Sequence, residues 1–128
     1  MGYSVDQLLI YQIAEELELR VFTVTQQFPR NEQYRSVDQL RRSSSSVSNN
    51  IAEMYNKRSV PDRIRILNDI CRGEIEETRT NLLRCAKKGF CGTADAEAIA
   101  LRYIELSKAV SGFIRYLRAK LPDHSHTR

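Results

Sequence analysis

Arginines recur at seven-residue intervals in the middle of the chain, at Arg65, Arg72 and Arg79. An α-helix advances about 100° per residue, so this spacing returns to nearly the same side with a drift of about 20°. The three guanidinium groups are therefore predicted to form a row on one helix flank, about 10.5 Å apart. Such a row suits a polyanion or an acidic protein. The alternative is a solvated flank in which Arg72 pairs with Glu76.

Other cations are predicted to lie away from the apolar faces of their own helices. Arg42 lies opposite the apolar stripe of its segment, and Lys108 and Arg115 lie away from theirs. Together with the row they are the candidate contacts for nucleic acid or for a protein partner. The candidate binding residues are Arg42, Arg65, Arg72, Arg79, Lys108 and Arg115.

The positive charge is unevenly distributed along the chain. The formal net charge is +4 and the sequence pI is about 9.1. Residues 1–29 hold one base against four acids, whereas residues 30–58 hold six bases against three acids. A basic surface built from the later helices would suit phosphates or an acidic partner.

No arrangement of residues typical of catalysis is found. The sequence lacks a glycine-rich phosphate loop, and its two histidines, His124 and His126, lie in a polar tail. Cys71, Cys85 and Cys91 form no zinc-binding pattern, and the first two lie on the core side of their helix. We therefore expect no enzyme, no metal and no cofactor.

The elements that must position the cations are predicted to be helices. Five glycines, three prolines and the absence of alternating β-branched runs favour an all-α protein. Breaks at Pro29, Pro61 and Gly89 separate helices over about 4–27, 31–57, 60–88 and 93–121. An antiparallel, up-down-up-down four-helix bundle of residues 1–121 follows, with a disordered polar tail at 122–128. The sequence shows no signal peptide and no apolar run long enough to cross a membrane, so a cytoplasmic location is expected.

The second helix carries a core stripe through a run of serines. The stripe consists of Tyr34, Val37, Leu40, Ser44, Val47, Ile51 and Tyr55. Small serine side chains in mid-helix allow a neighbouring backbone to approach closely, whereas the alternative interpretation is a flexible linker.

The first helix has two apolar strips. One serves the core, and the second, more than about 100° away, contains Leu8, Tyr11, Leu19 and Phe22. A bundle needs one strip per helix, so Leu8, Leu19 and Phe22 are predicted to contact another subunit. Alternatively, the helix is buried between its neighbours on all sides.

A resemblance to a known family rests on a motif that begins in the first turn. Its residues here are Phe28, Pro29, Glu32, Gln39, Arg42, Ser46, Asn50, Ile51, Ala52, Glu53, Arg58, Arg72, Gly73 and Glu76. The pattern, which spans about residues 20–90, resembles the four-helix bundle proteins encoded in ribosomal-RNA intervening sequences. Within that family it looks closest to the accessory variability determinant branch of diversity-generating retroelements, although Met54 stands where the pattern has glycine.

This resemblance implies a ring-like homo-oligomer, commonly pentameric, without a catalytic centre. Its partners would be a reverse transcriptase and the template RNA or complementary DNA, in mutagenic reverse transcription and retrohoming. Binding through phosphates would be largely non-specific. The alternative is a structural oligomer whose arginines pair between subunits, or a ribosome-associated or toxin-like bundle with no retroelement role.

Overall fold

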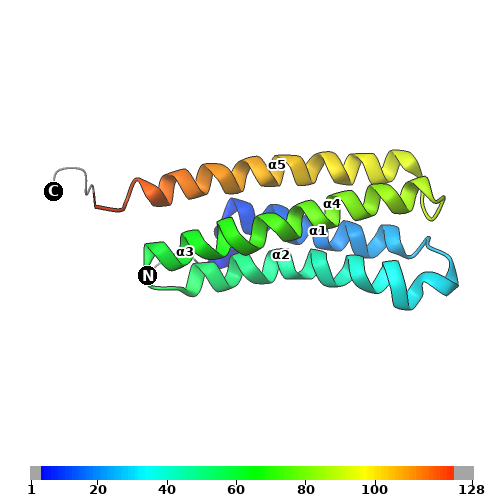
Figure 1. Cartoon of the computed structure of the whole chain (residues 1–128), viewed down its shortest axis with the longest axis horizontal. Helices are drawn as coiled ribbons and strands as arrows, with labels where there is room; N and C mark the ends of the chain where they lie inside the picture. Colours follow the sequence, from blue (N-terminus) through cyan, green and yellow to red (C-terminus); the bar gives the residue numbers. More distant parts are fainter. Residues whose placement is uncertain (1–3, 123–128) are drawn as a thin grey trace.

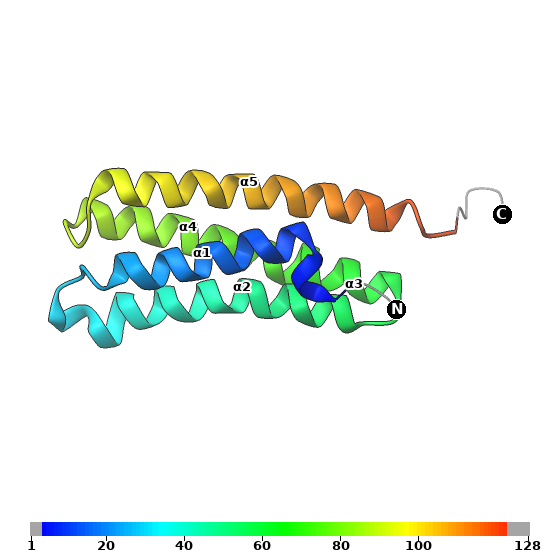
Figure 2. The same cartoon turned by 180° about the vertical axis from the view of Figure 1, so that it is seen from behind.

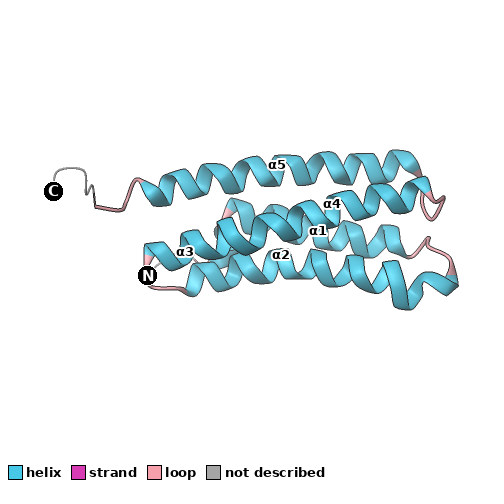
Figure 3. Cartoon of the chain, viewed as in Figure 1, coloured by secondary structure: helices cyan, strands magenta, loops and turns pink. Residues whose placement is uncertain are grey.

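The computed structural model describes residues 4–122, so the predicted tail lies outside the described residues except for Pro122. The α-helices are α1 (Leu9–Thr25), α2 (Asp38–Asn56), α3 (Val60–Arg65), α4 (Arg72–Lys87) and α5 (Thr93–Arg118). Helices and their connections account for all of the described part, which contains no strand (Figure 3). The predicted all-α class is confirmed.

Four long helices lie side by side along the long axis of the molecule (Figures 1 and 2). The third of them is continuous, because a π-helical segment, Ile66–Cys71, joins α3 to α4. The connections at residues 26–37 and 88–92 lie at one end of the bundle, and the connection from α2 to α3 lies at the other (Figure 1). Buried side chains from all four helices form one hydrophobic core.

The first helix begins later than predicted. Ser4 and Gln7 close a short 3-10 turn, in which the Ser4 N–H donates to Gln7 Oε1 at 3.1 Å. Leu8 then adopts an extended conformation, with φ −78° and ψ 126°, and packs against the core. Ser4 therefore caps the short 3-10 turn Val5–Gln7 and not the α-helix. The helix α1 begins only at Leu9.

The second helix follows the predicted stripe except at its two ends, because Tyr55 is only half-buried and the start of the stripe differs more strongly. Val37, Leu40, Val47 and Ile51 are buried, but Tyr34 is 92% exposed, so its predicted place in the core is wrong. The reason is that residues Gln33–Val37 form a π turn. Hydrogen bonds from residue i to i+5 replace the α-helical pattern there, which changes the direction of the side chain.

The serine run is helical and closely packed, so the linker alternative is rejected. Ser43, Ser44 and Ser48 are buried within α2. Thr78 Oγ1 donates to Ser43 Oγ at 2.8 Å, which ties α4 to α2, and Ser48 Oγ donates to Glu18 Oε1 at 2.6 Å, which ties α2 to α1. Small hydroxyl side chains thus fill the helix contacts while keeping their hydrogen bonds.

Two glycines, one within α4 and one directly after it, are expected to change the stability of the fold in opposite directions when replaced by alanine. Gly89 ends α4 with φ 82°, so Gly89→Ala should destabilise the fold by about 1–2 kcal/mol, because that backbone conformation crowds Cβ. Gly73 lies within the helix and a Cβ there meets nothing within 4 Å, so Gly73→Ala should stabilise by about 0.5–1 kcal/mol. Urea denaturation of the two variants measures both effects. A loss of stability in Gly73→Ala would contradict this account.

Candidate functional site

Arg79 and Lys108, which are far apart in the sequence, line the same cleft between α4 and α5. The cleft has a volume of about 210 Å³. The residues that line it are Ile75, Glu76, Arg79, Tyr103, Ile104, Ser107, Lys108 and Ser111. Two cations and three hydroxyl groups against one carboxylate make it a cationic, polar cleft.

Arg79 is anchored by the one carboxylate in that cleft. Its Nε lies 3.1 Å from Glu76 Oε1 and its Nη2 lies 2.6 Å from Oε2, while the side chain is only 24% exposed. These hydrogen bonds lower the pKa of Glu76, although burial opposes them, and they raise the pKa of Arg79. Arg79 is therefore held in a defined orientation.

One alternative predicted an ion pair between Arg72 and Glu76, and the structure does not contain it. Arg72 Nη1 donates to Asn68 Oδ1 at 3.2 Å, and within residues 4–122 Arg72 has no carboxylate partner. Lys108 and Arg115 are exposed and likewise have no ion pair within the described residues. Their charges are available to a ligand.

Two further cations lie on the same two helices as the cleft cations, and we call the set of Arg72, Arg79, Lys108 and Arg115 the α4–α5 seam. Arg72 lies seven residues before Arg79, and Arg115 lies seven residues after Lys108, so each pair shares one flank of its helix. Because α4 ends where α5 begins, both steps run toward the same end of the bundle (Figure 1). The structure thus brings Arg79 and Lys108 together in one cleft, and helical spacing places Arg72 and Arg115 two turns further along the same flanks.

The other two candidates lie elsewhere and have carboxylate partners. Arg42 lines a separate cleft between α2 and α4 with Glu74 and Glu77, and its Nη2 lies 2.9 Å from Asp38 Oδ2. Burial, together with the charge of Glu77, raises the pKa of Glu74. The surroundings of Arg42 are therefore not cationic.

Arg65 lies 3.8 Å from Asp62, measured from Nε to Oδ1. The π-helical segment Ile66–Cys71 separates Arg65 from Arg72, so the seven-residue spacing no longer places these two on one flank. The predicted row of three arginines is thus interrupted after Arg65.

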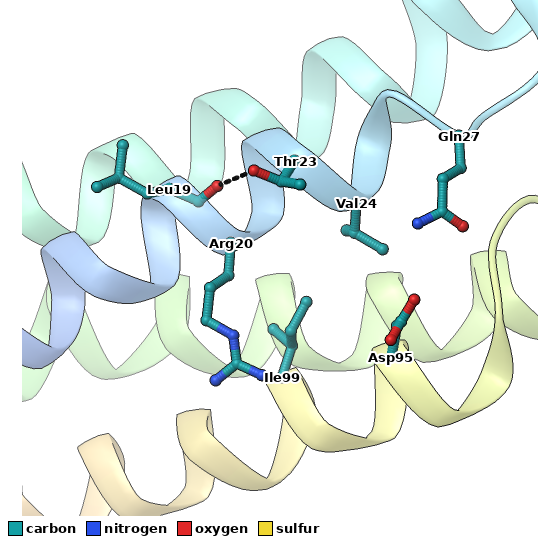
Figure 4. A pocket seen from close by; sticks show the side chains of 7 residues that line it. All are labelled: Leu19, Arg20, Thr23, Val24, Gln27, Asp95 and Ile99. Carbon is teal, nitrogen blue, oxygen red and sulfur yellow. Dashed lines mark hydrogen bonds between the residues drawn. The ribbon is translucent and has the colours of Figure 1, made fainter.

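Of the predicted subunit contact, Leu19 and Phe22 lie on the outer side of α1, whereas Leu8 precedes the helix and packs against the core. Leu19 is 63% exposed, Phe22 is 48% exposed and Leu8 is half-buried, so α1 is not buried on all sides. Leu19 points away from α5, whereas Arg20 extends toward it across a cleft (Figure 4). The Arg41 guanidinium lies 4.1 Å from the centre of the Phe22 ring and partly covers it.

Two sets of residues were missed in the sequence. Ser107 and Ser111 contribute hydroxyl groups to the α4–α5 cleft, and only their helical phase relative to Lys108 could have indicated this. Arg102 bridges α5 to α1, with its Nη2 3.0 Å from Glu16 Oε1, and its hydrogen bond lowers the pKa of Glu16. No local signal connects these two positions.

Among the described residues, no group of three or more His, Cys, Asp or Glu side chains could hold a metal ion. In the same part of the chain, no helix is both long and apolar enough to cross a membrane. Cys71 and Cys85 are buried, and burial raises the pKa of the Cys71 thiol to about 12. These thiols pack as small apolar side chains.

The described residues thus define a class of protein: a helical bundle with a cationic seam between two of its helices. A family model described as "23S rRNA-intervening sequence protein" matches residues 6–112, and the chain belongs to this family. The match includes α4 and most of α5, and with them every residue of the seam except Arg115. No curated protein matches the chain.

Proposed function

We propose that this protein is a non-catalytic accessory protein of a diversity-generating retroelement. It binds template RNA and complementary DNA and holds them beside a reverse transcriptase, in support of mutagenic reverse transcription and retrohoming. The retroelement role is supported by the resemblance of the motif from Phe28 to Glu76 to the accessory variability determinant branch. Nucleic-acid binding is supported by the structure of the α4–α5 seam.

The observation that supports binding is the set of cations on the facing flanks of α4 and α5, two of which, Arg79 and Lys108, line one polar cleft. Arg72, Lys108 and Arg115 have no ion pair within residues 4–122, and Arg79 retains N–H groups beyond its two bonds to Glu76. Phosphate oxygens suit such donors, and contacts to phosphates carry no sequence information. Binding is therefore largely non-specific and weakens steeply as salt rises.

The proposal includes a ring of subunits, which would strengthen binding to nucleic acid. In an up-down-up-down bundle that assembles as a pentamer, the exposed strip of Leu8, Leu19 and Phe22 meets a neighbouring subunit. Five copies of a chain with net charge +4 carry about +20, and repeated weak contacts with one strand gain avidity.

A second candidate function is favoured by the description of the matching family, which names 23S rRNA. In that case the protein is a structural or ribosome-associated bundle without a retroelement role. Co-purification of ribosomal RNA, together with a gene neighbourhood that lacks a reverse transcriptase, would support the second candidate over the first.

Neutralising the seam tests the binding surface. In a variant with Arg72→Gln and Lys108→Gln, the slope of log affinity for duplex DNA against log salt is expected to fall by about 2, because two phosphate contacts are lost. The matched control is Arg42→Gln with Arg65→Gln, which removes the same charge from residues already paired with Asp38 and Asp62. Fluorescence anisotropy across a salt series measures both. Equal losses in the two variants would show that net charge, and not the seam, governs binding.

A further inference from the structure

A second basic surface lies at the end of the bundle where the connections at residues 26–37 and 88–92 meet (Figure 1). The rings of Phe28 and Phe90 pack against each other there, with centroids 5.6 Å apart, so the two connections form one surface. We call it the turn surface and define it as residues 26–37 and 84–92. It takes in the end of α4 but none of the residues of the α4–α5 seam.

The turn surface is strongly cationic. Its exposed cations are Arg30, Arg35, Arg84, Lys87 and Lys88. Glu32 is the one carboxylate within its two ranges, so five positive charges face one negative charge. Within residues 4–122, none of the five cations takes part in an ion pair. Their guanidinium and ammonium groups are therefore not held by a carboxylate of the described residues.

Tyr34 belongs to the first of these two connections and is almost fully exposed. Its side chain is 92% exposed, and no hydrogen bond, ring contact or cation contact involves it within the described part of the chain. Tyr103, by contrast, is fully buried, and Tyr116 packs against Phe113 and Lys120. Tyr34 makes no contribution to the packing of the subunit.

The exposure of Tyr34 has a local structural cause. The α-helical period of α2 would place Tyr34 on the core stripe with Val37 and Leu40. The π turn Gln33–Val37 breaks that period, and Tyr34 takes φ −98° and ψ 15° within it. Turns of this kind occur frequently at functional sites. An aromatic ring is thus presented to solvent between cations instead of being buried.

We propose that Tyr34 stacks on an unpaired nucleobase, while the cations of the turn surface hold the phosphates on either side of that nucleotide. Proteins that bind single strands combine these two elements, because every base has a face that can stack and every nucleotide has a phosphate. In a duplex the base faces are covered by neighbouring pairs. The turn surface therefore distinguishes single strands from duplex, which goes beyond the phosphate binding of the proposed function, on which this inference rests.

The absence of tryptophan from the chain allows a direct test. In a Tyr34→Trp variant, the single indole reports contact at this position. We expect a 12-nucleotide single-stranded oligouridylate to quench its fluorescence, and heparin, a polyanion without bases, to leave it unchanged at saturation. A 12-base-pair RNA duplex should also leave it unchanged. Equal quenching by heparin would overturn the inference, because it would show a response to charge alone.

Affinity measurements complete the test. Tyr34→Ala is expected to weaken oligouridylate binding by about 5- to 100-fold, because one stacked base is lost, with the salt slope and duplex affinity unchanged. Tyr34→Phe should retain wild-type affinity, because it keeps the ring. Unchanged oligouridylate affinity in Tyr34→Ala, with duplex binding intact, rejects this inference alone, whereas a wild-type protein that binds neither probe rejects the proposed function as well. If Tyr34→Ala changes the mass of the assembly, Tyr34 is a subunit contact and the inference is wrong.

Discussion

For the proposed ring of subunits, Leu19→Glu is expected to convert the assembly to single subunits. Leu19 is 63% exposed on α1 and lines a groove together with Phe22, and its side chain is directed away from α5 (Figure 4). A carboxylate buried without a partner in a subunit contact costs several kcal/mol, so the association constant should fall by more than about 1,000-fold. Size-exclusion chromatography with light scattering measures the change in mass.

The matched control for this variant is Leu101→Glu. Leu101 lies on α5 and is 59% exposed, close to the exposure of Leu19, but it is outside the predicted strip. The control should keep both its helical circular dichroism and its assembled mass. If Leu19→Glu runs at the wild-type mass, the strip of Leu8, Leu19 and Phe22 is not the subunit contact. The proposed gain in avidity from a ring built through this strip would then be wrong.

Leu17→Ala is expected to destabilise the fold by about 3–5 kcal/mol. Leu17 is fully buried on the core side of α1, only two residues from the exposed Leu19. Removing its buried atoms loses their transfer free energy and leaves a cavity that the neighbouring helices fill incompletely. Urea denaturation at a fixed protein concentration measures the loss, since association would otherwise contribute to the apparent stability.

The control for the core prediction uses the same substitution on the surface. Leu101→Ala removes the same atoms from an exposed position and should change stability by less than about 0.5 kcal/mol. Similar losses in both variants would mean that the effect comes from helix propensity or from the unfolded state. A large loss only in Leu17→Ala supports the packing of α1 described here.

The helices and most of their buried faces could be predicted from the sequence, because both depend on local properties. Hydrophobic residues at helical spacing, such as Val37, Val47 and Ile51, are buried as the period predicts. Ser59 caps α3 through a hydrogen bond to the Asp62 N–H, and the glycine at position 89 ends α4. Caps and breaks act within a few residues, so they can be recognised without knowledge of the neighbours.

The composition of the candidate site was decided by the tertiary structure. Arg79 and Lys108 share a cleft only because α4 packs against α5, and Glu76 pairs with Arg79 and not with Arg72. The two π-helical segments could not be predicted from local sequence patterns. The first turns Tyr34 outward, and the second separates Arg65 from the seam. The sequence by itself determined the helices, their core stripes and the excess of positive charge. Which cations meet depends on contacts between distant segments, and a repeat in one helix says nothing about the helix packed beside it.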